Sequence, residues 1–213
     1  MKIKWWGHAS FLITTSKNKM ILTDPYNEEL PYNKITDKPD YVTVSHDHFD
    51  HNAVELLEGS PEVIKKSSGF EDDNISVEGI SVYHDDAEGD KRGENIIFVI
   101  DTDDFKIAHL GDLGHDLNNK QLSKLKNVDI LLIPVGGNYT IDAKRAKKIV
   151  DEIDPKIVIP MHYKTDILDF PITGVDEFLS YFEKKSVEII NGPEVEFDEI
   201  PSKQKLYLLD HVR

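Results

Sequence analysis

Two segments in the second half of the chain, DILLIP (129–134) and KIVIP (156–160), are apolar apart from one charged residue at the start of each. Such runs are typical of strands that are covered on both faces, because strands with one solvent-exposed face alternate apolar and polar residues. Between them, IDAKRAKKIVDEI (141–153) has its apolar residues at helical spacing and its lysines and arginine on the other face. A strand, an amphipathic helix and another strand indicate an α/β protein with layers around a sheet.

The remaining pattern extends this interpretation to the whole chain. The first half contains short strand-like runs separated by turn-rich pieces, and the second half alternates strands with helices. Helices are expected at 52–59, 118–128, 141–153 and 174–185, and closing strands at 187–190, 194–197 and 205–209. Since no linker or low-complexity segment interrupts the pattern, residues 1–213 are expected to form a single domain.

Composition excludes several classes of protein. The chain has no cysteine, so any metal must be held by nitrogen and oxygen ligands. The formal net charge of -15 argues against a nucleic-acid surface, which needs clustered lysine and arginine. No apolar run is long enough to span a membrane, and the N-terminal segment does not look like a signal peptide. A cytoplasmic location is therefore expected.

Two distant segments have a similar pattern. SFLITTSKNKMILTDP (10–25) and IIFVIDTDDFKIAHLGDL (96–113) both contain a strand, a polar turn, a second strand and then an aspartate. Chance similarity between two hairpins is the alternative explanation. If the similarity is structural, Asp24 and Asp112 emerge at equivalent strand ends, where α/β proteins gather functional groups.

The segment SHDHFDH (45–51) follows the expected strand YVTVS (41–45) and contains three histidines and two aspartates. In an extended chain His46 and His48 point the same way, whereas the adjacent Asp50 and His51 need a turn to share a site. The spacing favours two sites, one built by each pair, over a solvated acidic loop. Imidazole and carboxylate suit Zn²⁺, Mn²⁺ or Fe²⁺.

Two metal ions need more ligands than these four residues supply. His84 ends the expected strand ISVYH (80–84), His162 follows KIVIPM (156–161), and Asp112 lies between two glycines just past FKIAHL (105–110). All three stand at strand ends, like the first cluster. The residues therefore predict a dinuclear site.

These residues, taken in order, resemble the metallo-β-lactamase superfamily: H46-x-H48-x-D50-H51, then His84, Asp112 and His162. The segments GHASFLI, LTDP, RGEN, HLGDLG and PMHY look most like its branch of small metal-dependent hydrolases that is similar to ascorbate-6-phosphate lactonase. The resemblance implies a four-layer αββα sandwich with metals at one edge between the two sheets.

The resemblance also implies a division of the ligands. His46, His48 and His84 would hold the first metal; Asp50, His51 and His162 would hold the second, with Asp112 as the bridge. Asp24 would stand behind them and orient a histidine, as carboxylates often do. The alternative is an ordinary turn aspartate before Pro25.

Departures from the superfamily's other branches narrow the expected chemistry. β-Lactamases of this fold commonly use a cysteine for the second metal, and this chain has none. The diiron redox branch has a glutamate where this chain has His48, so the resemblance points to hydrolysis. The basic arm of the tRNA-processing branch is also missing from the sequence.

The other polar residues of interest have less certain roles. His109 is expected to pack structurally and His211 to be exposed in a polar tail, while His8 and His115 are expected either to support ligands or to line the cleft. Thr140 is expected to cap the helix that follows it. Candidates for substrate contact, each with a plain surface role as the alternative, are Arg92, Asn138, Tyr139 and Lys164.

Two divalent ions would lower the pKa of bound water, so a bridging hydroxide could attack a carbonyl carbon or a phosphorus. Asp50 is expected to be catalytic, holding the hydroxide's proton and passing it to the leaving group. The sequence thus predicts a dinuclear hydrolase, most simply with zinc, acting on a small and anionic ester, lactone or phosphoester. The alternatives are a phosphodiesterase acting on a nucleotide or phospholipid head group, or a metal- or ligand-binding sensor without turnover. A small molecule is the expected partner, and the sequence does not indicate an oligomeric state.

Overall fold

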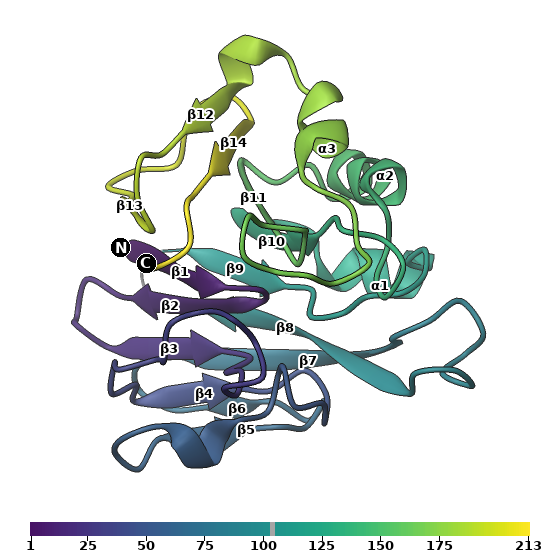
Figure 1. Cartoon of the computed structure of the whole chain (residues 1–213). Coiled ribbons are helices and arrows are strands. Elements are labelled where there is room, and N and C mark those ends of the chain that lie inside the picture. Colours follow the sequence, from purple (N-terminus) through teal and green to yellow (C-terminus); the bar gives the residue numbers. More distant parts are fainter. Residues whose placement is uncertain (103–104) are drawn as a thin grey trace.

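The structure is a computed structural model and describes residues 1–102 and 105–213. Two β-sheets pack face to face, and helices lie outside one of them (Figure 1). The first sheet has the order β13 (Glu194–Glu196), β1 (Lys2–Gly7), β2 (Ser10–Thr14), β3 (Met20–Thr23), β4 (Tyr41–Thr43), β5 (Glu62–Ile64). The second has the order β12 (Val187–Ile189), β14 (Lys205–Leu208), β11 (Ile157–Met161), β10 (Ile130–Pro134), β9 (Lys106–His109), β8 (Glu94–Asp101), β7 (Ser76–Tyr83), β6 (Phe70–Glu71).

Both sheets are mixed. The strands β3, β4 and β5 run parallel to one another, as do β9, β10, β11 and β14. The hairpins β2–β3 and β8–β9 are antiparallel, and each is followed by an aspartate, Asp24 or Asp112. The similarity between the two segments is therefore structural. The polar turn expected in the second segment includes residues 103–104, which lie outside the described residues.

Alternation along the first sheet divides its side chains between two cores. Ile13 and Ile21 face the second sheet, whereas their neighbours Leu12 and Leu22 face outward into a smaller cluster with Tyr26 and other loop residues. That outer face is covered by loops and the 3₁₀ turn η1 (Val54–Leu56). The expected layered α/β sandwich is confirmed, and its fourth layer consists of these loops.

On the other side, α2 (Ala143–Ile153) packs its apolar face on the second sheet beside α3 (Asp176–Ser180). Ile130 to Pro134 and Ile157 to Met161 are buried throughout, as their continuous apolar runs predict. The helix begins two residues later than a Thr140 cap requires. Asp142 caps it by accepting a hydrogen bond from the backbone N–H of Arg145 at 2.8 Å, and Thr140 donates to the carbonyl of Ile141 instead.

Three expected helices are shorter than the sequence indicates. The segment 118–128 forms only α1 (Asn119–Lys124), which Asn118 and Gln121 cap reciprocally. The segment 174–185 forms α3, followed by the 3₁₀ turn η2 (Lys184–Ser186). The segment 52–59 forms η1, because its hydrogen bonds join residues three apart, as in Leu56 to Ala53.

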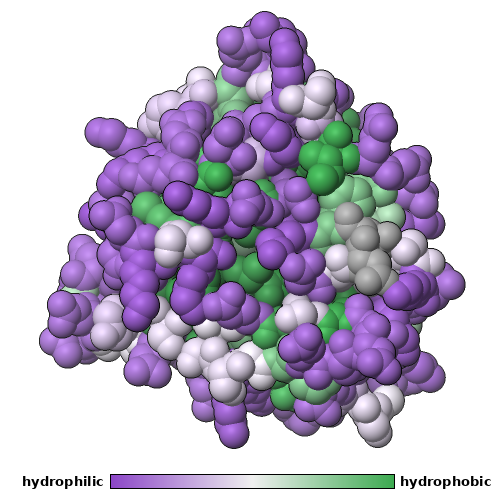
Figure 2. Space-filling model, turned by 180° about the vertical axis from the view of Figure 1, so that it is seen from behind, coloured by the Kyte–Doolittle hydropathy of each residue, from purple (hydrophilic) through white to green (hydrophobic). Residues whose placement is uncertain are grey.

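The surface is largely hydrophilic on the side opposite to that of Figure 1, with hydrophobic residues in scattered groups (Figure 2). Within the described ranges, no helix has both the length and the apolar character needed to cross a lipid bilayer.

Candidate metal centre

One edge of the sandwich gathers the residues that follow several strands. Asp24 follows β3, the segment 45–51 follows β4, His84 follows β7, Asp112 lies just past β9, and His162 follows β11. Strands that run in the same direction end at the same edge, which is why residues so far apart in sequence meet here. The turn between β1 and β2 adds His8 to the same edge.

The first cluster consists of His46, His48 and His84. One ring nitrogen from each lies within 4.8 Å of the others, as metal ligation requires. The ring of His46 lies 4.5 Å from that of His48 and 4.7 Å from that of His84. The structure brings together the three ligands expected for the first metal, with His84 buried and His48 exposed.

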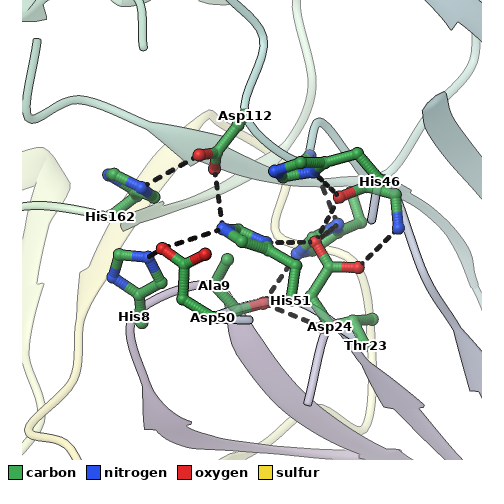
Figure 3. A network of polar contacts seen from close by, with 12 residues as sticks. His8, Ala9, Thr23, Asp24, His46, Asp50, His51, Asp112 and His162 are labelled. Carbon is green, nitrogen blue, oxygen red and sulfur yellow. Dashed lines mark hydrogen bonds and ion pairs between the residues drawn. The ribbon is translucent and has the colours of Figure 1, made fainter. Parts of the chain in front are cut away.

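The second cluster consists of Asp50, His51 and His162, and it also contains His8 (Figure 3). His8 is fully buried, and its Nε2 lies 3.2 Å from Oδ2 of Asp50. Its ring centroid lies 4.0 Å from that of His162. The sequence left His8 either to support the ligands or to line the cleft. In the structure it lies among the expected ligands of the second metal.

Asp112 lies between the clusters. Its Oδ2 is 3.2 Å from Nε2 of His84 and 3.1 Å from Nε2 of His162, and its Oδ1 is 3.3 Å from Nε2 of His51. One carboxylate thus faces a histidine from the first cluster and two from the second. This is the position expected of a group that bridges two cations.

Several buried polar atoms of the two clusters have no hydrogen-bond partner. They include Nε2 of His46, whereas Nε2 of His51 and Oδ1 of Asp112 lie 3.3 Å apart as an ion pair without a further partner. A buried polar atom without a partner costs about 1–3 kcal/mol, and here such atoms converge on one small volume. Nitrogen and carboxylate oxygen donors in this arrangement fit a divalent cation.

Asp24 forms hydrogen bonds with two residues of the centre. Its Oδ2 accepts hydrogen bonds from Nδ1 of His51 at 2.9 Å and from Oγ of Ser45 at 2.6 Å, and its Oδ1 accepts from the backbone N–H of Ser45 at 2.8 Å. Because Nδ1 of His51 is occupied, its Nε2 is directed to the cluster (Figure 3). Asp24 does orient a histidine of the site.

Two residues of the centre are absent from the sequence interpretation. The Ser45 hydroxyl connects Asp24 to Nδ1 of His46, which lies 2.9 Å away. Buried Asn95 accepts a hydrogen bond from the backbone N–H of Asp112 and donates to the carbonyl of Leu110. The available signals were the position of Ser45 at the strand end and the position of Asn95 in the RGEN segment.

The charges of the centre are strongly coupled. Burial and the neighbouring His51 lower the pKa of His46 to about 2, and burial and His162 lower the pKa of His8 to about 4. Burial opposes ionisation of Asp112, but His162 and His51 outweigh it and hold the pKa of Asp112 well below 3.8. Burial likewise opposes protonation of His51, yet the Asp112 and Asp24 carboxylates raise its pKa well above 6.5. The carboxylates thus attract positive charge to this pocket.

Three residues of the centre adopt a left-handed backbone conformation, which is uncommon outside glycine. These are His8 (φ 52°), Asp24 (φ 39°) and His162 (φ 50°). The backbone N–H of His162 donates a hydrogen bond to the carbonyl of His8 at 3.1 Å, and this bond joins the two strained residues directly. Strain of this kind gathers at functional sites, where the surrounding structure enforces it.

The expected substrate residues lie in different surroundings. The guanidinium of Arg92 lies over the ring of Tyr139, 5.3 Å from its centroid. Asn138 is exposed, and Lys164 is exposed and pairs with Asp169 at 3.7 Å. His115 accepts a hydrogen bond from the backbone N–H of Tyr83 and so supports the end of β7 next to His84.

Two further histidines test the sequence interpretation. His109 is buried and its Nε2 lies 2.8 Å from the carbonyl of Ala9, so the expected packing role is confirmed. The expectation that His211 is exposed is wrong. The C-terminal segment pairs with β1 through the Val212 N–H and the Trp5 carbonyl, which buries His211 between Trp5 and Tyr32.

A buried carboxylate fixes the loop that follows the first cluster. Asp85 accepts hydrogen bonds from the backbone N–H groups of Ala87, Gly89, Lys91 and Arg92. Burial would raise the pKa of Asp85, but these donors outweigh burial and lower it to about 2. The charged loop 85–93 is therefore tied to the strand end that carries His84.

Comparisons with known proteins agree with this geometry. The family model of the β-lactamase superfamily domain matches residues 2–162. A UPF0173 metal-dependent hydrolase of Nanoarchaeum equitans is 32% identical over 219 residues, covering 89% of this chain and 95% of its own length. Another of Thermoplasma acidophilum is 32% identical over 191 residues, covering 78% and 84%.

A crystal structure gives the same result. A Thermotoga maritima protein, assigned to the Zn-dependent hydrolases of the metallo-β-lactamase superfamily, superposes with a TM-score of 0.85 at 37% identity. The match covers 100% of this chain and 99% of the other. The agreement extends from the sequence motifs to both sheets. The chain therefore belongs to the metallo-β-lactamase superfamily and, within it, to the UPF0173 family of metal-dependent hydrolases.

Proposed function

We propose that this protein hydrolyses a small anionic ester, lactone or phosphoester with two divalent cations. The observation that carries the proposal is the position of Asp112, whose carboxylate lies 3.1–3.3 Å from three imidazoles of two separate clusters. His46, His48 and His84 would hold one cation, and Asp50, His51, His162 and His8 the other. Zinc is the first choice, because the ligands are nitrogen and oxygen and the Thermotoga maritima relative is assigned to the Zn-dependent hydrolases.

When bound, cations of this kind lower the pKa of water and neutralise charge that develops on an oxygen atom. Asp50 then accepts the proton of the attacking water on its carboxylate and returns it to the leaving group. Its Oδ2 is held by Nε2 of His8, so this oxygen stays in one place during both transfers. Asp24 and Ser45 keep His51 and His46 in position.

The substrate classes follow from separate observations. Carbonyl and phosphorus centres both suit attack by water at a cationic centre. The lactone is included because the sequence motifs resemble those of ascorbate-6-phosphate lactonase. The partner is accordingly a small molecule.

The test combines metal analysis with turnover. Protein purified without chelators is expected to contain about two divalent ions per chain, and the loaded protein is expected to hydrolyse members of a panel of lactones, activated esters and phosphodiesters. A single tightly bound ion, with no second site at saturating concentration, would overturn the two-metal proposal. Two bound ions without any turnover would favour the sensor alternative.

A further inference from the structure

A groove of about 560 Å³ opens beside the first cluster. His46 and His48 form part of its lining, and Lys65 and Arg92 bring two cationic side chains to it. Two carboxylates, Asp47 and Glu94, also line the groove. What the groove binds therefore depends on which of these charges are free to meet a ligand.

Arg92 is the cation that is available. In the ranges 1–102 and 105–213, no carboxylate lies within 4 Å of its guanidinium. Lys65 instead donates to Oδ1 of Asn52 at 2.5 Å, and the amide nitrogen of Asn52 donates to Asp47 at 2.5 Å. Asn52 thus links the Lys65 ammonium to the Asp47 carboxylate, whereas within the described ranges no such link joins the Arg92 guanidinium to a carboxylate.

Arg92 is also held in place. Its backbone N–H donates to Oδ2 of Asp85 at 2.8 Å, and Asp85 directly follows His84 of the first cluster. The guanidinium carbon lies 5.3 Å from the centroid of the Tyr139 ring, a cation–π contact that restricts where the group can move. A cation whose backbone is held and whose side chain is restricted has less entropy to lose when it binds an anion.

Aromatic side chains continue from Arg92 to the second cluster. The rings of Tyr139 and Phe170 meet edge to face at 6.0 Å, and the ring of Phe170 meets that of His8 at 5.9 Å. Both aromatic residues are partly buried. The centre therefore has a cation at one end and apolar ring surface beside it.

We propose that Arg92 binds an anionic group of the substrate, a carboxylate or a phosphate, while Tyr139 and Phe170 hold an apolar part next to it. The inference rests on the proposed hydrolase function and names the substrate class, organic anions with an apolar or aromatic body. Guanidinium suits this task because its planar fork binds both oxyanions through two parallel hydrogen bonds. Aromatic rings suit the neighbouring part because they bury apolar surface with few rotatable bonds.

The binding test uses phenylphosphonate and methylphosphonate as probes, with calorimetry on the full chain in loaded and chelator-treated forms. Arg92→Gln is expected to weaken phenylphosphonate binding by about 10–100-fold in both forms, the range for a lost charge-assisted bond. Arg92→Lys is expected to have an affinity for phenylphosphonate between those of the wild type and Arg92→Gln. Lys91→Gln, which removes the same charge one residue away, is expected to bind like the wild type. Phe170→Ala is expected to reduce the preference for phenylphosphonate over methylphosphonate.

Turnover provides the second measurement. Arg92→Gln is expected to raise KM for anionic 4-nitrophenyl phenylphosphonate by a similar factor, and to raise KM for neutral 4-nitrophenyl acetate by a much smaller one. Unchanged phenylphosphonate affinity in Arg92→Gln, or an equal loss for the neutral ester, would overturn the assignment. If the wild type hydrolyses no member of the panel of lactones, activated esters and phosphodiesters but phenylphosphonate binding still depends on Arg92, the hydrolase proposal fails and the anion site stands.

Discussion

At the residue scale, the centre depends on groups that fix the direction of each imidazole. His51 donates from Nδ1 to Asp24, which leaves Nε2 facing Asp112. Neutral imidazole has one donor and one acceptor nitrogen, so occupying one nitrogen decides what the other can bind. A buried aspartate that touches no substrate thus determines which atom a cation would meet.

Replacing Asp112 with Ala is expected to separate metal binding from catalysis. The first ion keeps His46, His48 and His84, whereas the second should bind about 10–100-fold more weakly, taking the scale of lost supporting contacts as a lower bound. Activity is expected to fall further than metal content, because the group shared by both clusters is gone. The measurement is a zinc or manganese titration of the stripped variant with turnover and melting temperature followed together.

The matched control for this variant is Asp116→Ala, an exposed aspartate of the same loop that pairs with Lys148 at 3.2 Å. It is expected to behave like the wild type. Full recovery of activity in Asp112→Ala at excess metal would show that Asp112 is not the bridge.

Replacing Asp24 with Ala is expected to destabilise the protein as well as the centre. It leaves the buried Ser45 N–H and the His51 Nδ1–H without an acceptor, at about 1–3 kcal/mol for each group. Metal affinity should fall because His51 is free to turn. Urea denaturation and metal titration would measure the two effects, and Asp24→Asn, which keeps an acceptor oxygen, should lose less of both. Wild-type stability in the Ala variant would contradict the network.

Replacing His8 with Asn is expected to weaken the second ion and spare the first. Asn tolerates the left-handed backbone of this position, so the variant removes the imidazole with little added strain. In the cobalt-substituted variant, the visible absorption of one of the two bound ions should change. The control is His109→Gln, which should leave metal content near that of the wild type. Retention of both cobalt signals in His8→Asn would show that His8 only packs against the ligands.

Sequence reasoning was most effective for residues whose type and strand-end position carry the chemistry. It identified seven of the eight proposed ligands, since His46, His48, Asp50, His51, His84, Asp112 and His162 lie together. It could not place His8, because a histidine in a hairpin turn shows no partner until the sheets are assembled. It also misplaced His211, whose burial depends on contacts with Trp5 and Tyr32 far away in the chain.

At the scale of elements, long apolar runs were predictable and short helices were not. The strands β10 and β11 and the helix α2 lie close to the expected ranges, because continuous burial or a full apolar face leaves a strong pattern. The segment 52–59 forms a single 3₁₀ turn, with hydrogen bonds between residues three apart. Local preference alone does not determine such short elements.

The loop 85–93 allows a prediction at this scale. Lys91 and Arg92 are trypsin sites whose backbone N–H groups are held by Asp85. Asp85→Ala is expected to speed tryptic cleavage of this loop by roughly ten-fold, because a charge-assisted acceptor is lost. Asp86→Ala, which removes the neighbouring carboxylate and its bond to the Lys91 side chain, is the control and should be cut at the wild-type rate. Equal cleavage of both variants would mean that other contacts fix the loop.

At the scale of the whole molecule, the centre connects both sheets. Asp24 and His51 follow strands of the first sheet, and His84, Asp112 and His162 follow strands of the second. A cation held by His51 from one sheet and by Asp112 and His162 from the other would stabilise the packing of the two sheets, in addition to the apolar core between them.

Removal of metal is therefore expected to lower global stability without changing the fold. An ion present at a hundred times its Kd stabilises the folded state by about 2.7 kcal/mol. Urea unfolding with and without chelator should show a lower midpoint and an unchanged slope in the stripped protein, and circular dichroism should show the same strand content. Identical midpoints at saturating zinc or manganese would contradict binding by both sheets.

The spread of the centre along the chain also has a kinetic meaning. His8 lies in the first hairpin and His162 follows β11, while only the segment 46–51 brings several ligands together locally. Folds that depend on pairing distant segments form slowly, because loops must close before those contacts can form. An ion that meets the unfolded chain finds only the local segment, and the complete centre appears after both sheets are in place. The time needed to assemble the strands, rather than the diffusion of the ion, determines how soon a new chain becomes active.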